Sequence, residues 1–410
     1  MRRVVVSGLG IISPIGNDLE SVKNALVTGR SGIRAVPEWS RYDGLGSLVA
    51  GIVDDIEPSV IARSYRRTMG RVGILATLAA KNAVAHAALS AEMLNTQRAG
   101  VSMGSTTGSS AALEKFFGDF HDTGGITKLE GTLFMKVMSS TVAVNVAAVL
   151  GTKGRVIAPC NACASSTQAI GLGYEAIRYG SQDIMICGGA DELHPSTIGV
   201  FDALNAASRR YNNRPNMTPR PFDWERDGLV ISEGAAVLVL EDYEHAIARR
   251  AKIYGEVLGY ATNCNAAHMT QPCSQAMLDC MRQALDVVGC RPENLDYINA
   301  HATGTELGDK AEAEAIRRLV GEAVPVSSTK GHTGHTLAAC GAMEAIFCLM
   351  MMQNGFIFPT FNLDHVDPDC SGIAHVTRVT KATSKIVMSS NFAFGGVNAS
   401  LVLGNTDERD

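Results

Sequence analysis

Residues 158–166 read Ala-Pro-Cys-Asn-Ala-Cys-Ala-Ser-Ser and connect a predicted strand to a predicted helix. The sequence pattern predicts the strand over 154–157, a helix of mostly small residues over 164–179, and a second strand over 183–187. This order of elements indicates a βαβ unit with Cys163 at or just before the first helical turn. Free backbone N–H groups and the positive end of the helix dipole favour an anion there, so Cys163 is a candidate thiolate nucleophile.

A packed, unreactive thiol is the competing interpretation of Cys163, because a cysteine among small residues commonly belongs to a core. Cys160 adds a Cys-x-x-Cys spacing, which is typical of redox or zinc sites. His332 and His335 would complete a set of four metal ligands. Their His-x-x-His spacing is shorter than that of the usual zinc motifs, and a metal on Cys163 would abolish its nucleophilicity. We therefore predict no metal.

The composition excludes several functional classes. The chain has 410 residues, of which 46% are hydrophobic, so it is long enough for two domains or one fused double unit. A net charge of -5 gives no basic excess for nucleic acid. The longest apolar stretches are shorter than the roughly 20 residues of a membrane span, and the ten cysteines form no regular disulfide pattern. We expect a cytoplasmic protein without a nucleic-acid or membrane partner.

Strands and helices alternate along the whole chain, which predicts an α/β fold. The alternation restarts after a charged turn near residue 252, so we expect an N-terminal half over 1–252 and a C-terminal half over 253–410. No internal repeat is legible at the residue level. Gly8 and Gly10 follow the first strand, but the third glycine of the dinucleotide fingerprint is missing, which argues against a dehydrogenase.

Two histidines of the second half follow predicted strands. His301 ends the strand that begins near residue 297, and His335 follows a strand and loop that begin near residue 324. In α/β architectures such strand ends are where sites assemble. One cysteine with two remote histidines therefore suggests acyl transfer through a thioester.

Four motifs carry a family resemblance. They are Ala162-Cys163-Ala164-Ser165, His301-Ala302-Thr303-Gly304-Thr305 with Gly308-Asp309, Lys330 with Gly334-His335, and Asn391-Phe392-Ala393-Phe394-Gly395-Gly396. Together they resemble the β-ketoacyl-acyl carrier protein synthases of fatty acid synthesis, and the likeness extends from Arg3 to Leu403. It is greatest to the elongating enzymes with a Cys-His-His site.

The resemblance implies a thiolase fold, with two similar halves in a five-layer α-β-α-β-α sandwich, and a homodimer. It also implies decarboxylative condensation of an acyl chain with malonyl-acyl carrier protein, without a redox cofactor. Two alternatives stay open at this point. A non-catalytic chain-length factor would lack the nucleophile, and a degradative thiolase would use a second cysteine as its base.

Matching positions assign roles by resemblance. Cys163 would take the acyl chain, and its own amide and that of Phe394 would form the oxyanion hole. His301 and His335 would serve malonyl decarboxylation. The residues expected to hold the histidine network are Lys330 and Glu312.

The resemblance also assigns binding residues. Those expected at the phosphopantetheine arm are Thr303 and Thr305, those at the acyl chain are Met138, Phe201 and Phe392, and those that dock the acidic carrier protein are Arg63, Arg66 and Arg67. The arginines recur at helical spacing, for which a solvated helix face is the simpler explanation. Ala393 stands where glycine is common in the family, so the preferred acyl chain stays open, as does the choice between housekeeping fatty acid synthesis and a specialised polyketide or polyene route.

Overall fold

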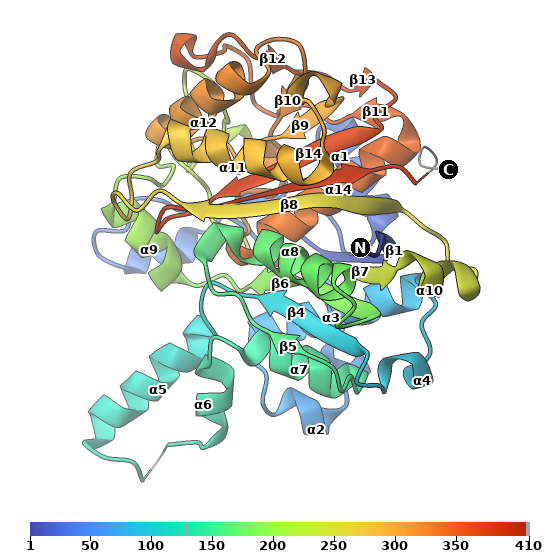
Figure 1. Ribbon diagram of the computed structural model, residues 1–410. Coiled ribbons are helices and arrows are strands. Elements are labelled where there is room, and N and C mark those ends of the chain that lie inside the picture. Colours follow the sequence, from blue (N-terminus) through green and yellow to red (C-terminus); the bar gives the residue numbers. More distant parts are fainter. Residues whose placement is uncertain (128, 407–410) are drawn as a thin grey trace.

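Within residues 1–127 and 129–406, which the computed structural model describes, eleven strands pair in one mixed sheet (Figure 1). The last four positions of the predicted C-terminal half, 407–410, lie outside the described residues. In order across the sheet, the strands of the first part are β5 (Val156–Ile157), β4 (Ala99–Gly104), β6 (Ile184–Asp191), β7 (Gly234–Asp242) and β1 (Val4–Ile12). Those of the second part are β8 (Gly255–Cys264), β15 (Val397–Gly404), β14 (Ile386–Phe392), β9 (Tyr297–Asn299), β10 (Pro325–Ser327) and β12 (Ala374–His375).

The two parts of the sheet repeat one topology. Outward from its centre, the first part runs β1, β7, β6, β4 and β5 through two antiparallel and then two parallel pairings. The second part runs β8, β15, β14, β9 and β10 through the same sequence of pairings. They meet where β1 pairs with β8 through Val5 with Glu256 and Val6 with Gly255. The chain is thus a double unit, although its sequence shows no legible repeat.

Helices form three layers around the sheet. One core places α8 (Ser165–Arg178) and α14 (Cys340–Asn354) between the two parts of the sheet. A second packs α3 (Arg71–His86) and α7 (Thr141–Leu150) on the outer face of the first part. A third packs α11 (Ser274–Val288) and α12 (Glu306–Leu319) on the outer face of the second part. The layers therefore follow the order α-β-α-β-α (Figure 1).

Helix α14 shows why the central layer forms. It is apolar on all sides, as expected of a helix enclosed by other elements, and almost every residue from Cys340 to Met352 is buried. The segment Leu337–Asn354 is long and apolar enough to cross a membrane by composition, yet 89% of it is buried inside the protein. It is therefore a core helix of the sandwich.

The remaining elements lie around this body. The helices are α1 (Leu19–Thr28), α2 (Arg63–Arg66), α4 (Ala91–Leu94), α5 (Ser110–Thr123), α6 (Thr132–Val137), α9 (Pro195–Ala203), α10 (Tyr243–Ala248) and α13 (Lys330–Thr333). The short strand pairs are β2 (Ile33–Ala35) with β3 (Val49–Gly51), and β11 (Phe356–Ile357) with β13 (Thr380–Lys381). Helices α5 and α6 stand out from the body (Figure 1). The predicted division of the chain at residue 252 falls between α10 and β8 and stays a prediction.

Candidate active site

Cys163 lies in a sharp turn between β5 and α8. The predicted helix start is a 3-10 turn over Ala162–Ala164, which leads directly into α8. Ala162 has a φ of 45°, in the left-handed region that non-glycine residues rarely adopt, and such strained turns are enriched at functional sites. The second half has the same kind of strained turn, since Leu337 has a φ of 49° at the start of the 3-10 turn before α14. The turn thus sets Cys163 at the first turn of a central helix.

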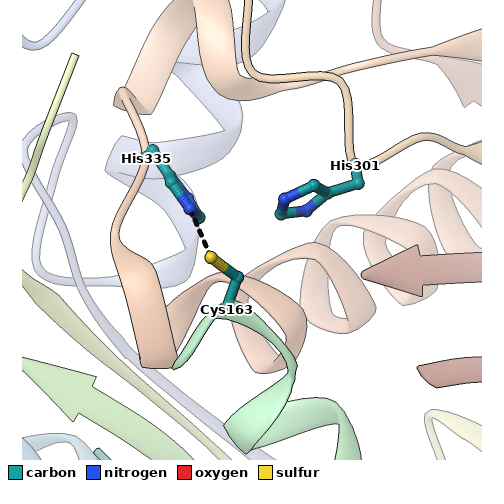
Figure 2. Close-up of side chains that lie close together, drawn as sticks. All are labelled: Cys163, His301 and His335. Atoms are coloured by element: carbon teal, nitrogen blue, oxygen red, sulfur yellow. Dashed lines mark hydrogen bonds between the residues drawn. The ribbon is translucent and has the colours of Figure 1, made fainter. Parts of the chain in front are cut away.

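The structure brings Cys163 together with both predicted histidines (Figure 2). The Sγ of Cys163 lies 2.9 Å from Nε2 of His335. The rings of His301 and His335 lie edge to face, with centroids 5.2 Å apart. One potential ligand atom from each residue falls within a 4.8 Å group. That spacing would also suit a metal ion, so the absence of a metal stays a prediction.

Burial decides the charge of these groups. It raises the pKa of Cys163 to about 12, although Lys330 and the backbone N–H groups of Cys163 and Phe394 favour the thiolate. It lowers the pKa of His301 and His335 well below the usual value, and the Lys330 charge lowers them further. The resting site is therefore a neutral thiol beside neutral imidazoles.

In the resting site, burial therefore opposes the thiolate that the helix N-terminus favours. Desolvation of the buried sulfur outweighs the dipole and the amides. The thiol instead needs a base at the moment of reaction. His335 Nε2, at hydrogen-bond distance from Sγ, is positioned to take the proton.

Lys330 and Glu312 have different hydrogen-bond partners and therefore different roles near the histidines. Lys330 forms a buried ion pair with Glu344, which the sequence analysis missed. Glu312 accepts hydrogen bonds from the backbone amides of His301, at 2.7 Å, and Ala302, at 2.6 Å. It therefore fixes the backbone of the histidine loop, with its pKa raised to about 8 by burial. The available signal for Glu344 was its position as the one charged residue of the apolar helix α14.

A second carboxylate that was not predicted from the sequence, Asp191, supports the same active site. Asp191, at the end of β6, accepts hydrogen bonds from the amide of Ala338 at 2.8 Å and from the hydroxyl of Thr106 at 2.6 Å. Ala338 lies three residues after His335, in the turn that leads into α14. Burial raises the pKa of Asp191 to about 7. A buried carboxylate thus holds the backbone of the turn that follows His335.

A cavity of about 480 Å³ opens onto the three catalytic candidates. The predicted binding residues that line it are Phe201, Thr303, Thr305 and Phe392. Phe394, whose amide is expected at the oxyanion hole, lines it too. The rings of Phe201 and Phe394 stack at 5.4 Å, with an interplanar angle of 22°, and form one wall. Lys330 is buried and does not line the cavity, so it acts on the site through its charge.

Besides Lys330, four predicted residues do not line this cavity. Met138 follows α6, on the part of the chain that stands out from the body, and is not among the cavity's lining residues. Its expected contact with the acyl chain stays a prediction. Arg63, Arg66 and Arg67 lie in or next to α2, where Arg63 and Arg67 are exposed and Arg66 is half-buried.

Comparison with known proteins decides the family. Residues 1–246 match the domain described as Beta-ketoacyl synthase, N-terminal domain, and residues 254–364 match Beta-ketoacyl synthase, C-terminal domain. The chain belongs to the β-ketoacyl synthase family. It is 38% identical to 3-oxoacyl-[acyl-carrier-protein] synthase 1 of Haemophilus influenzae, over 98% of each chain.

Solved structures of the family agree with this assignment. A β-ketoacyl synthase from Burkholderia phymatum superposes with a TM-score of 0.96 at 41% identity and covers 99% of this chain and 100% of its own. A type II polyketide ketosynthase, AntDE, in complex with its acyl carrier protein AntF, gives a TM-score of 0.90 at 31% identity over 99% and 100%. The predicted five-layer thiolase fold is therefore confirmed.

Proposed function

We propose that the chain catalyses decarboxylative Claisen condensation of a cysteine-bound acyl chain with malonyl-acyl carrier protein, in fatty acid or related polyketide or polyene elongation. The product is β-ketoacyl-acyl carrier protein. The observation that carries the proposal is the 2.9 Å contact between Cys163 Sγ and His335 Nε2 at a cavity that His301 also lines. The proposed reaction needs no redox cofactor and no metal, since it consists of acyl transfer followed by loss of carbon dioxide.

The first half-reaction loads the acyl chain. As Cys163 attacks the thioester carbonyl of the donor, His335 takes the thiol proton, and the proton then passes to the leaving pantetheine sulfur. The backbone amides of Cys163 and Phe394 favour negative charge at the Cys163 sulfur, and we assign them to the oxyanion hole that stabilises the tetrahedral intermediate. The carrier leaves as a free thiol, and Cys163 holds the acyl group as a thioester.

The second half-reaction breaks the bond between the malonyl carboxylate and its α-carbon. Carbon dioxide leaves, and the bonding electron pair forms an enolate whose oxygen needs hydrogen-bond donors already in place. His301 and His335 are neutral because burial lowers their pKa values, so each can donate from a ring N–H without carrying charge. At His335 this requires the single ring proton to move from Nδ1 to Nε2 once loading is complete, because Nε2 is bare while it serves as the base. The enolate carbon then attacks the acyl-Cys163 carbonyl and expels the cysteine sulfur as a thiolate, which takes up one proton to restore the resting thiol.

The proposal is tested by a complete turnover assay. The protein is incubated with a series of acyl-acyl carrier proteins and then with malonyl-acyl carrier protein, and intact mass spectrometry follows both partners. We expect an acyl adduct on the protein, then a carrier product that is longer by two carbons, and the adducts formed rank the preferred chains. An acyl adduct without any condensed product would refute the proposed function.

We further propose that an acidic carrier protein docks at the arginines in and next to α2. The complex of AntDE with its acyl carrier protein supports a carrier protein as the partner. Arg63→Glu combined with Arg67→Glu should raise the KM for carrier-bound substrates about tenfold, because two lost surface ion pairs of up to about 1 kcal/mol each sum to that order. The same double variant should leave the KM for a small pantetheine thioester unchanged, and rising salt should narrow the difference.

Arg282→Glu combined with Arg291→Glu is the matched control for this test. Both arginines are exposed, but they lie on and after α11, on the outer face of the second part. This control carries the same charge change and should keep the wild-type KM for both substrates. Equal losses on carrier-bound and small substrates in the α2 variant would remove the docking assignment.

We also propose that the protein is a cytoplasmic homodimer. Three aromatic side chains of α5 and α6, namely Phe117, Phe120 and Phe134, are exposed in the single chain, and a second copy could cover them. Strand β5 lies at the edge of the sheet with Val156 exposed, and an unpaired edge of this kind can pair with another chain. Sedimentation of the purified protein measures its oligomeric state.

A further inference from the structure

Asn391, near the end of β14, forms a side-chain hydrogen bond with the ring of His301. Its Nδ2 lies 3.2 Å from Nδ1 of His301. The His301 ring points toward the His335–Cys163 pair from one side (Figure 2). The direction of this one hydrogen bond decides which ring nitrogen carries the proton. If Asn391 donates, Nδ1 accepts and the proton must lie on Nε2.

The orientation of the Asn391 amide is fixed by two partners. Its Nδ2 donates to Oε2 of Glu344 at 2.7 Å, and its Oδ1 accepts from the hydroxyl of Thr167. Glu344 faces the ammonium group of Lys330 with its other oxygen, so both carboxylate oxygens act as acceptors. Turning the amide over would set Oδ1 against that carboxylate, which is unfavourable in a buried site.

The second hydrogen of the Asn391 amide has two neighbours. They are Nδ1 of His301 at 3.2 Å and the thiol sulfur of Cys340 at 3.4 Å. An imidazole nitrogen is a better acceptor than a thiol sulfur, which accepts only weakly. This hydrogen therefore belongs to His301.

Gly341 makes the arrangement possible. A Cβ at this position would lie 1.9 Å from Oγ1 of Thr167 and 2.6 Å from Oδ1 of Asn391, closer than any real side-chain carbon approaches. The absence of a side chain lets α8, α14 and β14 meet at one polar contact. Three elements of the central sandwich thus converge on the amide that contacts His301.

We propose that Asn391 is a positioning residue that holds His301 as the Nε2–H tautomer, so that the ring presents a hydrogen-bond donor to the reacting oxygen. The role in decarboxylation rests on the proposed function, whereas the tautomer is a property of the free protein. Asn391 itself does not line the cavity. It acts through His301, and the Lys330–Glu344 pair acts through Asn391.

The test replaces Asn391 with leucine, which has a similar size but no donor. Nitrogen NMR of ¹⁵N-histidine-labelled protein reads the tautomer without substrate, and the His301→Ala spectrum identifies the signals. We expect a bare Nδ1 and a protonated Nε2 in the wild type, and a mixture of both tautomers in Asn391→Leu. Decarboxylation of a malonyl pantetheine thioester should fall about 100-fold, the loss typical of one oriented donor, whereas acyl loading of Cys163 should persist.

Two further variants keep the test decisive. Thr167→Val removes the hydroxyl that anchors Oδ1, and should shift the tautomer in the same direction, also where Asn391→Leu does not fold. Asn145→Leu removes a buried amide from α7, whose partners are Thr141 and Thr68, and should change neither readout. A protonated Nδ1 in the wild type, an unchanged tautomer in Asn391→Leu and Thr167→Val, or a changed tautomer with wild-type decarboxylation would each overturn the proposal. A wild-type protein that neither loads nor decarboxylates would refute the proposed function while leaving the tautomer measurable.

Discussion

Replacing Cys163 with alanine should abolish acyl loading and condensation and leave the fold intact. The side chain supplies the nucleophile, and the loss of such a group commonly reduces turnover by about 10⁴-fold or more. The substitution removes one sulfur from a site that already opens onto the cavity, so little packing is lost. Intact mass after incubation with acyl-acyl carrier protein measures loading, and thermal unfolding followed by circular dichroism measures the fold.

The Cys160→Ser variant is the matched control for that result. Cys160 is exposed and its thiol donates to the carbonyl oxygen of Thr106 at 3.2 Å, a bond that a serine hydroxyl can also make. We therefore expect loading and condensation close to wild type. Loading of Cys163→Ala would remove the nucleophile assignment, and a large loss in Cys160→Ser would revive the redox interpretation of the Cys-x-x-Cys spacing.

The strands and helices that carry the site could be predicted because each has a signal in its own stretch of sequence. A strand pattern followed by small residues places Cys163 at a helix start, and a strand end precedes both His301 and His335. Strand β6 continues to Asp191, four residues beyond the predicted end, because its last residues still pair with β7. The repeat of the two halves could not be read, since it resides in the order and direction of strand pairing and not in residue identities.

The energetics of the site depend on contacts between distant segments and could not be predicted. The helix start alone suggests a thiolate, but Cys163 is buried and its pKa rises to about 12. The partner of Lys330 lies one helix away, at Glu344, and the motif that contains Asn391 gave no hint that its amide faces His301. Such pairings follow from how α14 packs between the two parts of the sheet.

Substitutions of the two histidines should slow different steps of the reaction, because His335, and not His301, hydrogen-bonds the thiol. His335→Ala should slow acyl loading by about 10² to 10⁴-fold, the range of a lost general base. It should also slow malonyl decarboxylation. His301→Ala should spare loading, because no hydrogen bond joins its ring to Sγ among the described contacts, and should reduce decarboxylation by about 10² to 10³-fold as a lost donor.

The pH dependence separates these roles further. In His335→Ala the thiol has no base, and burial, which raises the pKa of Cys163 to about 12 in the wild type, should keep the thiol protonated over this range, so loading should rise with the thiolate fraction, about tenfold per pH unit. In the wild type His335 takes the proton directly, and loading should vary far less over the same range. Loading and decarboxylation are measured separately from pH 7 to 10, with His332→Gln as the control.

His332 is the suitable control because it shares the His335 segment without sharing its contacts. Its ring is buried, stacks on Phe361 at 4.7 Å and contacts the carbonyl oxygen of Arg30. A general effect of disturbing this segment would appear in His332→Gln as well. If His335→Ala loads acyl chains at the wild-type rate with a flat pH profile, His335 is not the base that activates Cys163, and if His301→Ala decarboxylates normally, His301 has a structural role.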